Sequence, residues 1–138
     1  MTNDLQNILS FLPHRPPFVM VSELVSATEG HFETRFFVSS ENLFVENGKL
    51  SESALIENIA QSCACGLGFL SQKAGEPAKT GYIGSVSKLK VHRLPPVNCM
   101  IDTHAQVTFK MGNIYVIKGE NFLDGDMLLQ CEMKIVAQ

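Results

Sequence analysis

Three polar side chains interrupt an otherwise apolar stretch and have the types and spacing needed for acid–base chemistry. Residues 50–72 read as one long helix that is apolar almost all the way round, which is typical of a buried helix. Glu57 and Gln61 are four residues apart and Asn58 and Gln61 three, so these side chains leave one side of that helix. A buried carboxylate is costly unless a partner or a ligand uses it. We therefore expect Glu57 to be shielded from solvent and to mark the site of chemistry.

A structural explanation of Glu57 stays open beside the catalytic one. The carboxylate could lie near the start of the helix and accept hydrogen bonds from loop amides, with no part in a reaction. Small residues recur along the same helix at Ala60, Ala64, Gly66 and Gly68, so another backbone can lie close against it. This spacing favours a sheet that wraps round the helix.

Length and composition restrict the class of protein. The 138 residues suffice for one domain with a real core, which we expect to span residues 1–138. The net charge of −3 argues against a nucleic-acid-binding protein, which would have a basic balance. No apolar run reaches the roughly 18 residues of a membrane span, and the N-terminus lacks the pattern of a signal peptide. We expect a cytoplasmic protein that binds no nucleic acid and has no membrane span.

The cysteines do not predict a metal site. Cys63, Cys65, Cys99 and Cys131 have apolar neighbours, where Cys behaves as a small hydrophobic residue. Cys63 and Cys65 are two residues apart on the helix, so their side chains diverge by about 200° and cannot share one metal ion. We expect reduced thiols, no metal and no cofactor.

The remaining segments predict a short helix, strands and tight turns. A helix through Ile8 must end before Pro13, and residues 18–25 and 32–38 pair as a hairpin. Ser51 or Ser53 caps the long helix. Four strands follow that helix, with alternating apolar and polar residues in the second and the fourth. Their ranges are 82–92, 99–110, 114–123 and 127–137.

The order of these elements predicts the fold class. An antiparallel sheet with one wet face must cover its other face, and only helix 50–72 is apolar enough to be enclosed. The sequence thus predicts an α+β domain in which about six strands wrap round one long central helix.

Two motifs resemble those of a known family. Residues 12–24, LPHRPPFVMVSEL, look like the Leu-Pro-His-Arg-x-Pro-Phe start of the (3R)-hydroxyacyl-[acyl-carrier-protein] dehydratases. Residues 54–61, ALIENIAQ, look like the Glu-Ala-Met-Ala-Gln helix of the same family, and residues 84–95 resemble the strand that follows it. The resemblance runs from about Leu12 to Ile135. It implies the hotdog fold, in which two domains usually join their sheets edge to edge and the active site lies at the dimer interface.

The resemblance assigns the family's catalytic acid to Glu57, but no residue of this chain matches the family's catalytic base. Glu57 matches the residue that acts on the β-hydroxyl, and a peptide amide at the helix start would hold the thioester carbonyl. The family's base is a His in a Gly-His-Phe-Pro-Gly loop, whereas residues 43–50 read LFVENGKL and contain no histidine. A positioned base contributes typically about 100-fold to 10,000-fold, so the site is degenerate. A subgroup found with polyene and pigment biosynthesis, which also lacks this loop, looks closer still.

None of the histidines is an obvious substitute for that base. His14 belongs to the N-terminal motif, where the family's equivalent His is structural. His31 lies beside a turn, His92 ends a strand and His104 lies on the polar side of its strand. We expect these last three side chains on the surface.

Further residues are expected to bind the substrate. On the long helix, Ser53, Asn58 and Gln61 are candidates for contacts with the acyl thioester. Leu89 and Val91, on the next strand, would line either the core or an acyl tunnel.

A group of basic residues at the end of the same strand predicts a docking surface. Lys88, Lys90 and Arg93 could bind an acidic acyl carrier protein. They could equally protect an edge strand from aggregation.

These residues favour a 3-hydroxyacyl-carrier-protein dehydratase-like protein that binds or acts on acyl thioesters in fatty-acid or polyene-type biosynthesis. The acyl group would be carried by an acyl carrier protein or coenzyme A. Two alternatives remain: an acyl thioesterase of the hotdog fold in which Glu57 activates water, and a non-catalytic partner of a complete dehydratase. We expect a homodimer, or a heterodimer with another hotdog protein.

Overall fold

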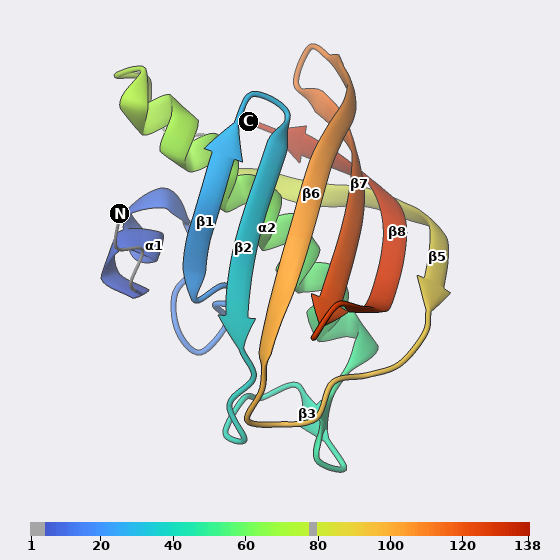
Figure 1. Cartoon of the computed structure of the whole chain (residues 1–138). Coiled ribbons are helices and arrows are strands. Elements are labelled where there is room, and N and C mark those ends of the chain that lie inside the picture. The colour runs from blue at the N-terminus through green and yellow to red at the C-terminus, as the bar shows by residue number, and fades with distance from the viewer. Residues whose placement is uncertain (1–4, 78–79) are drawn as a thin grey trace.

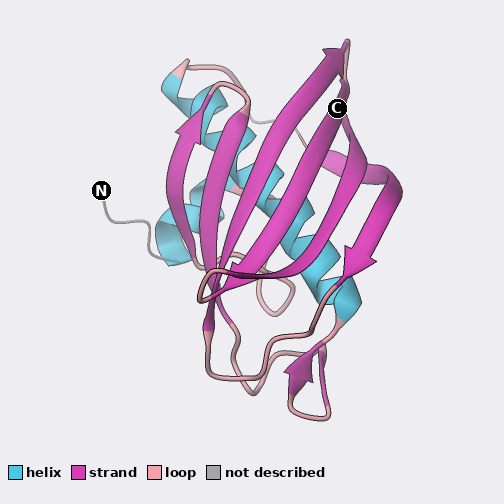
Figure 2. Ribbon diagram, turned by 45° about the vertical axis from the view of Figure 1, so that its right-hand side comes forward, coloured by secondary structure: helices cyan, strands magenta, loops and turns pink. Residues whose placement is uncertain are grey.

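One curled sheet surrounds one long helix, as Figures 1 and 2 show. The structure is a computed structural model and describes residues 5–77 and 80–138. Six antiparallel strands follow the order β1-β2-β6-β7-β8-β5, and a small hairpin, β3-β4, lies apart from them. The expected α+β hotdog architecture is confirmed. The elements are α1 (Leu5–Phe11), β1 (Glu23–Thr28), β2 (His31–Phe37), β3 (Val45–Glu46), β4 (Lys49–Leu50), α2 (Glu52–Lys73), β5 (Gly81–Val91), β6 (Met100–Met111), β7 (Ile114–Leu123) and β8 (Asp126–Ala137).

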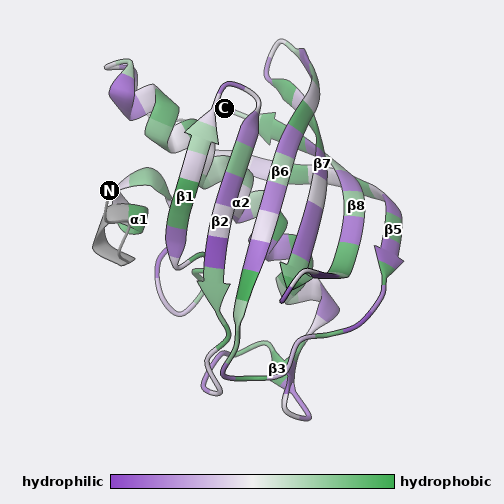
Figure 3. Ribbon diagram, in the orientation of Figure 1, coloured by the Kyte–Doolittle hydropathy of each residue, from purple (hydrophilic) through white to green (hydrophobic). Residues whose placement is uncertain are grey.

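The central helix α2 starts at a serine cap and buries one side against the sheet. The Ser51 hydroxyl accepts a hydrogen bond from the backbone N–H of Ala54, which satisfies one of the free donors at the helix start. Leu55, Ile59 and Cys63 are fully buried and form part of the main core. Along β2, β6 and β7, hydrophilic and hydrophobic residues alternate, so that one face of the sheet is wet (Figure 3). None of the described helices has the length and apolarity to cross a membrane.

Two glycines allow the sheet and the helix to approach closely. A side chain at Gly66 would collide with the ring of Phe32, and one at Gly119 would collide with the side chain of Ile59. Gly66 belongs to α2 and Gly119 to β7, so both the helix and the sheet lack a side chain where they pack against each other.

We expect Gly119→Ala to lower the free energy of unfolding by about 1–3 kcal/mol, because an added methyl group overpacks a core that has no room for it. Urea unfolding followed by circular dichroism measures the change. Gly84→Ala on the edge strand β5 is the control, since a side chain there meets only ordinary van der Waals contacts. Equal midpoints for the two variants would contradict this account of the packing.

The segment before β1 is not the strand that the sequence predicts. Helix α1 ends at Phe11, before Pro13 as expected, but β1 begins only at Glu23 rather than at Phe18. The side-chain amide of Gln61 binds the backbone of this segment. The Met20 N–H donates to Gln61 Oε1 at 2.7 Å, and Gln61 Nε2 donates to the Phe18 carbonyl at 2.9 Å. These bonds attach the segment to α2 in place of a neighbouring strand.

A β-bulge near the end of β6 reverses the faces of its last residues. The register with β7 shifts between Val107 and Phe109. The alternation in the sequence predicts Phe109 on the core side with Ile101, and this is wrong, because Phe109 is 54% exposed. Lys110 instead lies on the same face as the buried Tyr115, with its ammonium over that ring, although Lys110 itself stays exposed.

Candidate active site

A cavity of about 550 Å³ lies between α2 and the strands that curl back over it. One wall is the helix, from Glu57 through Ala64 to Ser71. The opposite wall includes Ile83 of β5 and Ile135 of β8. The expected catalytic carboxylate therefore shares a pocket with apolar walls, which is the arrangement that binding sites for small molecules usually have.

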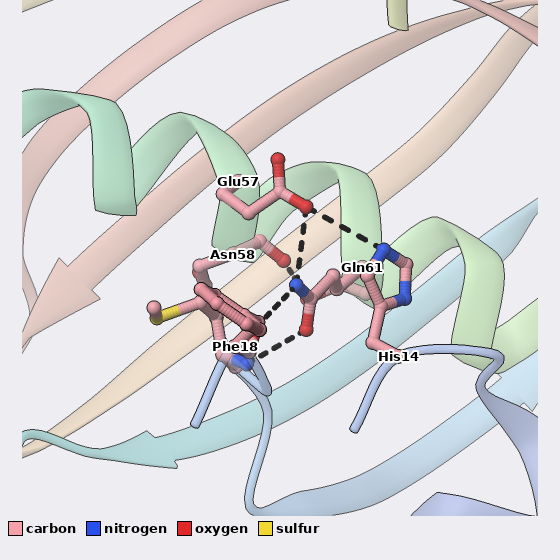
Figure 4. Close-up of polar contacts among 7 residues, drawn as sticks. His14, Phe18, Glu57, Asn58 and Gln61 are labelled. Carbon is pink, nitrogen blue, oxygen red and sulfur yellow. Dashed lines mark hydrogen bonds and ion pairs between the residues drawn. The ribbon is translucent and has the colours of Figure 1, made fainter. Parts of the chain in front are cut away.

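Glu57 lies at the edge of this pocket, and one of its two carboxylate oxygens is held (Figure 4). Gln61 Nε2 donates a hydrogen bond to Glu57 Oε1 at 3.1 Å, one turn further along the helix. His14 Nε2 lies 3.6 Å from the same oxygen. The Glu57 side chain is 38% exposed, so the expected shielding from solvent is wrong for the single chain. The side of α2 that carries Glu57 faces the open pocket, whereas the side that carries Asn58 and Ile59 packs against the sheet.

His14 reaches the pocket from the segment that follows α1. The 3.6 Å separation is beyond a good hydrogen bond, and it becomes an ion-pair distance only if the imidazole is protonated. His14 Nδ1 is buried, and no group in the described part of the chain hydrogen-bonds it. The tautomer with its proton on Nε2 leaves no buried N–H without an acceptor, and it directs that proton toward Glu57. In this tautomer the nitrogen that faces Glu57 has no lone pair, so His14 is poorly suited to act as the base.

Asn58 and Gln61 are buried and bonded to the protein. The amide of Gln61 is used by the backbone at Phe18 and Met20 and by Glu57. Asn58 donates to the Met20 carbonyl at 2.7 Å and accepts from the Thr103 hydroxyl at 2.5 Å. Neither residue lines the pocket. Their place differs from the substrate contacts expected from the sequence, because the segment before β1 takes up their hydrogen-bonding groups.

The other residues expected to bind substrate are not brought to Glu57 within one chain. Ser53 is exposed in the first turn of α2, with its hydroxyl 3.2 Å from that of Ser51. Leu89 and Val91 lie toward the far end of β5, and both are exposed and outside the pocket lining. A role for these three residues therefore needs surface contributed by another molecule.

The basic residues of β5 and the loop after it are exposed. Lys88 lies 3.7 Å from Glu132, and Arg93 lies 3.9 Å from Asp126. Such exposed pairs contribute little to stability. Lys90 is also exposed, so all three cations remain available at the free edge of the sheet. Docking of a carrier protein and protection of the edge both remain compatible with this placement.

The loop in which the family carries its base is a tight hairpin. The strands β3 and β4 are joined by Asn47 and Gly48, whose φ angles of 53° and 75° are typical of a two-residue hairpin turn. His31 and His104 contact each other at 3.4 Å on neighbouring strands, and His92 is exposed after β5. Of the histidines in the described residues, only His14 lines the pocket.

The cysteines and the acidic residues add no other reactive centre in the described residues. Burial raises the pKa of the Cys63 and Cys65 thiols to about 12, so both stay protonated near neutral pH. Within residues 5–77 and 80–138, no group of three or more His, Cys, Asp or Glu is arranged to hold a metal ion. Two carboxylates line the pocket, Glu57 on α2 and Glu76 after its end, and no well-placed base lies opposite Glu57 in the described residues.

Comparisons with known proteins find dehydratases over nearly the whole chain. The family model described as ApeP-like, ApeP dehydratase, matches residues 6–138. The 3-hydroxyacyl-[acyl-carrier-protein] dehydratase FabZ of Nitratiruptor sp. is 27% identical over 95% of this chain and 95% of its own length. FabZ of Anaeromyxobacter sp. is 28% identical over 94% of this chain and 86% of its own length.

Two solved structures show how widely the fold is shared. The dehydratase heterocomplex ApeI:P from Xenorhabdus doucetiae contains a chain with a TM-score of 0.89 and 17% identity, covering 95% of this chain and 90% of that one. A hypothetical thioesterase with coenzyme A from Streptococcus pneumoniae has a TM-score of 0.67 and 10% identity, covering 84% of both chains. At these identities the structural matches establish the fold alone.

Proposed function

Because the chain belongs to the ApeP-like dehydratase family, we propose that it supplies the acid of a dehydratase that acts on 3-hydroxyacyl thioesters of an acyl carrier protein. The chain is dehydratase-like, as its FabZ relatives are 3-hydroxyacyl-carrier-protein dehydratases. The observation that carries the proposal is Glu57, which lines an open pocket with partly apolar walls and has no well-placed base beside it in the described residues. The cytoplasmic location expected from the sequence is part of the same proposal.

The proposed reaction divides two proton transfers between two groups. A base removes the proton from C2 of the 3-hydroxyacyl group, and the protonated Glu57 gives its proton to the hydroxyl on C3. The C3–O bond breaks, water leaves, and a double bond forms between C2 and C3. Free backbone N–H groups in the first turn of α2 would hold the thioester carbonyl, where negative charge develops. Gln61 keeps one oxygen of Glu57 in place, so the other can face the substrate.

The base would come from a second hotdog protein joined at the free edge of β5. This strand ends the sheet, and its outer edge has no strand beside it in the described residues. Its side chains are almost all exposed, including Val86 and Val91 on the side that faces the helix. An uncovered apolar edge strand is unfavourable in a single chain and suits pairing with another sheet. The dehydratase heterocomplex ApeI:P from Xenorhabdus doucetiae supports a partner of this kind.

A thioesterase is the second candidate. In that reaction Glu57 would activate water to attack the thioester carbonyl. The likeness to the thioesterase from Streptococcus pneumoniae concerns the fold alone, whereas the dehydratase family matches nearly the whole sequence. Dehydration is therefore the better supported activity.

The decisive experiment mixes the chain with a hotdog protein of the same organism that carries an intact Gly-His-Phe-Pro-Gly loop. We expect the mixture to convert a 3-hydroxyacyl carrier protein to the enoyl form, measured by mass spectrometry of the carrier protein. Free fatty acid in place of enoyl product would favour the thioesterase. An unchanged substrate in the presence of a stable complex would contradict both activities.

We also expect the chain to form a dimer or a higher even oligomer, alone or with that partner, because β5 leaves apolar surface uncovered. Light scattering during size-exclusion chromatography measures the mass. Val86→Glu on β5 should weaken the assembly, since it places a charge in the proposed contact. Val25→Glu on the opposite edge strand, β1, is the control with similar exposure. A stable monomer at micromolar concentration would count against edge-to-edge pairing.

A further inference from the structure

The pocket that holds Glu57 also holds a lysine and a tyrosine that the dehydration chemistry does not use. Lys110 and Tyr115 are directly paired across β6 and β7, and both line the pocket. The ammonium of Lys110 lies 5.2 Å from the centre of the Tyr115 ring, which is within reach of a cation–π interaction. A charged group and a phenol are unusual in a pocket that would serve only an alkyl chain.

The β-bulge in β6 is what brings Lys110 to the pocket. Without the shift between Val107 and Phe109, the alternation of the strand would turn Lys110 outward and Phe109 inward. The bulge instead leaves Phe109 54% and Met111 65% exposed, which removes apolar surface from the core. Packing alone does not account for this arrangement. Bulges occur often beside active sites, where they redirect a side chain, and Lys110 is redirected here.

The register of the sheet places this pair far from Glu57. Tyr115 lies in one cross-strand row with Ile135 and Ile83. Two rows further along lies Gly81, which is paired with Ala137 and starts β5 after the connection from the end of α2. Lys110 and Tyr115 therefore lie toward the C-terminal end of α2, where Ser71 lines the pocket. At about 1.5 Å per residue, Ser71 is roughly 21 Å along the helix from Glu57.

The pocket is apolar between these two ends. Ala60, Ala64 and Leu67 contribute from the helix, and Ile83 and Ile135 contribute from the sheet. The pocket thus has an acid at one end, a lining suited to methylene groups in the middle, and polar groups at the other end.

In the described residues, Lys110 and Tyr115 have no polar partner, although Glu76 and Thr80 line the same end of the pocket. Within residues 5–77 and 80–138, no carboxylate pairs with Lys110 and no group hydrogen-bonds the Tyr115 hydroxyl. Tyr115 is nevertheless buried. Lys110 is exposed, so the desolvation argument applies to the Tyr115 hydroxyl. An alkyl end against this hydroxyl would leave it without a hydrogen bond, which is unfavourable, whereas an acceptor on the ligand would bond to it and could also meet the Lys110 ammonium.

We propose that Lys110 and Tyr115 select acyl chains by their distal end, and that they favour a chain ending in a hydrogen-bond acceptor, such as a hydroxyl or a carboxylate, over an alkyl chain of equal length. The inference rests on the proposed function, since it takes the acyl chain to run along the pocket from a thioester near Glu57. Beyond the proposed function, it specifies the distal end group of the substrate and the two residues that recognise that group.

Binding of unreactive substrate analogues tests this inference separately from catalysis. The analogues are enoyl pantetheine amides of one chain length, with an amide in place of the thioester and with methyl, hydroxyl or carboxylate at the distal carbon. Isothermal titration of the 138-residue chain, in the oligomer that it forms, measures each dissociation constant. We expect the hydroxyl or the carboxylate analogue to bind roughly tenfold more tightly than the methyl analogue. A gain for carboxylate alone would assign the recognition to Lys110, and a gain for both would include the Tyr115 hydroxyl.

Two conservative variants and one control identify the residues. Lys110→Met and Tyr115→Phe keep the bulk of each side chain, and each should bring the three affinities closer together. Lys118→Met is the control, because Lys118 is exposed on β7 outside the pocket. Equal affinities for the three analogues, or a preference that survives both pocket variants, would overturn the inference and leave the proposed function standing. If none of the analogues binds, the proposed function itself fails.

Discussion

Glu57→Gln should lower dehydration by the chain in complex with its base-bearing partner by about 100-fold to 10,000-fold, the range that one acid–base group typically supplies. The amide keeps the size of the carboxyl group and can still accept the hydrogen bond from Gln61 Nε2. It has no acidic proton to give to the leaving hydroxyl. The loss should therefore appear in kcat, with a smaller change in KM, when enoyl carrier protein is measured over a range of substrate concentrations.

A second acidic residue of the same pocket provides the control for this variant. Glu76 also lines the pocket but lies after the end of α2, and Glu76→Gln should leave kcat within a small factor of the original. The assignment of Glu57 as the acid fails if Glu57→Gln and Glu76→Gln have the same kcat as the unchanged protein.

The second large effect concerns the chain without its partner. We expect the purified chain to dehydrate a 3-hydroxyacyl carrier protein at least about 100-fold more slowly than a family member with the complete Gly-His-Phe-Pro-Gly loop, because no residue of the pocket is placed to remove the C2 proton. Adding the partner should restore the rate. A titration of partner against a fixed amount of chain, read as initial rate, should saturate at a simple stoichiometric ratio.

His14 is the residue of this chain that could replace the partner as the source of the base. A chain that is fully active alone, and that loses its activity on His14→Gln but not on Glu57→Gln, would place the base on His14. We expect the opposite result. The His14 nitrogen near Glu57 carries the proton in the favoured tautomer, and the other nitrogen is buried away from solvent. His14→Gln should therefore affect the rate much less than Glu57→Gln.

Much of the fold follows from local patterns in the sequence. The apolar run at residues 50–72 predicts α2 to within about two residues, and the turn pairs Asn47-Gly48 and Asp124-Gly125 lie at tight corners with positive φ angles. The strands after α2 are also found to within one or two residues, because alternation and turn residues act over short distances.

The details of the site depend on contacts between distant segments, and these were not predictable from local patterns. The exposure of Glu57 depends on how far the sheet curls round α2. The use of the Gln61 amide by the backbone of Phe18 and Met20 joins residues about 40 positions apart. The position of Lys110 on the same face as Tyr115 depends on a one-residue irregularity in β6, which periodicity cannot reveal. For His14, the LPHR motif was the available signal, and it did not indicate a place beside Glu57.

The β3-β4 hairpin has a consequence for how such a protein can evolve. Its two corner residues both have left-handed backbone conformations, and its strands contain two residues each. The family's Gly-His-Phe-Pro-Gly sequence is absent from this loop as a whole, so we do not expect a histidine placed in the hairpin by one substitution to recreate the family's base. To carry out the proposed reaction without a partner, the chain would need an insertion in this loop as well as the new histidine. On the proposed function, the genes of this chain and its partner are therefore bound to be inherited and retained together.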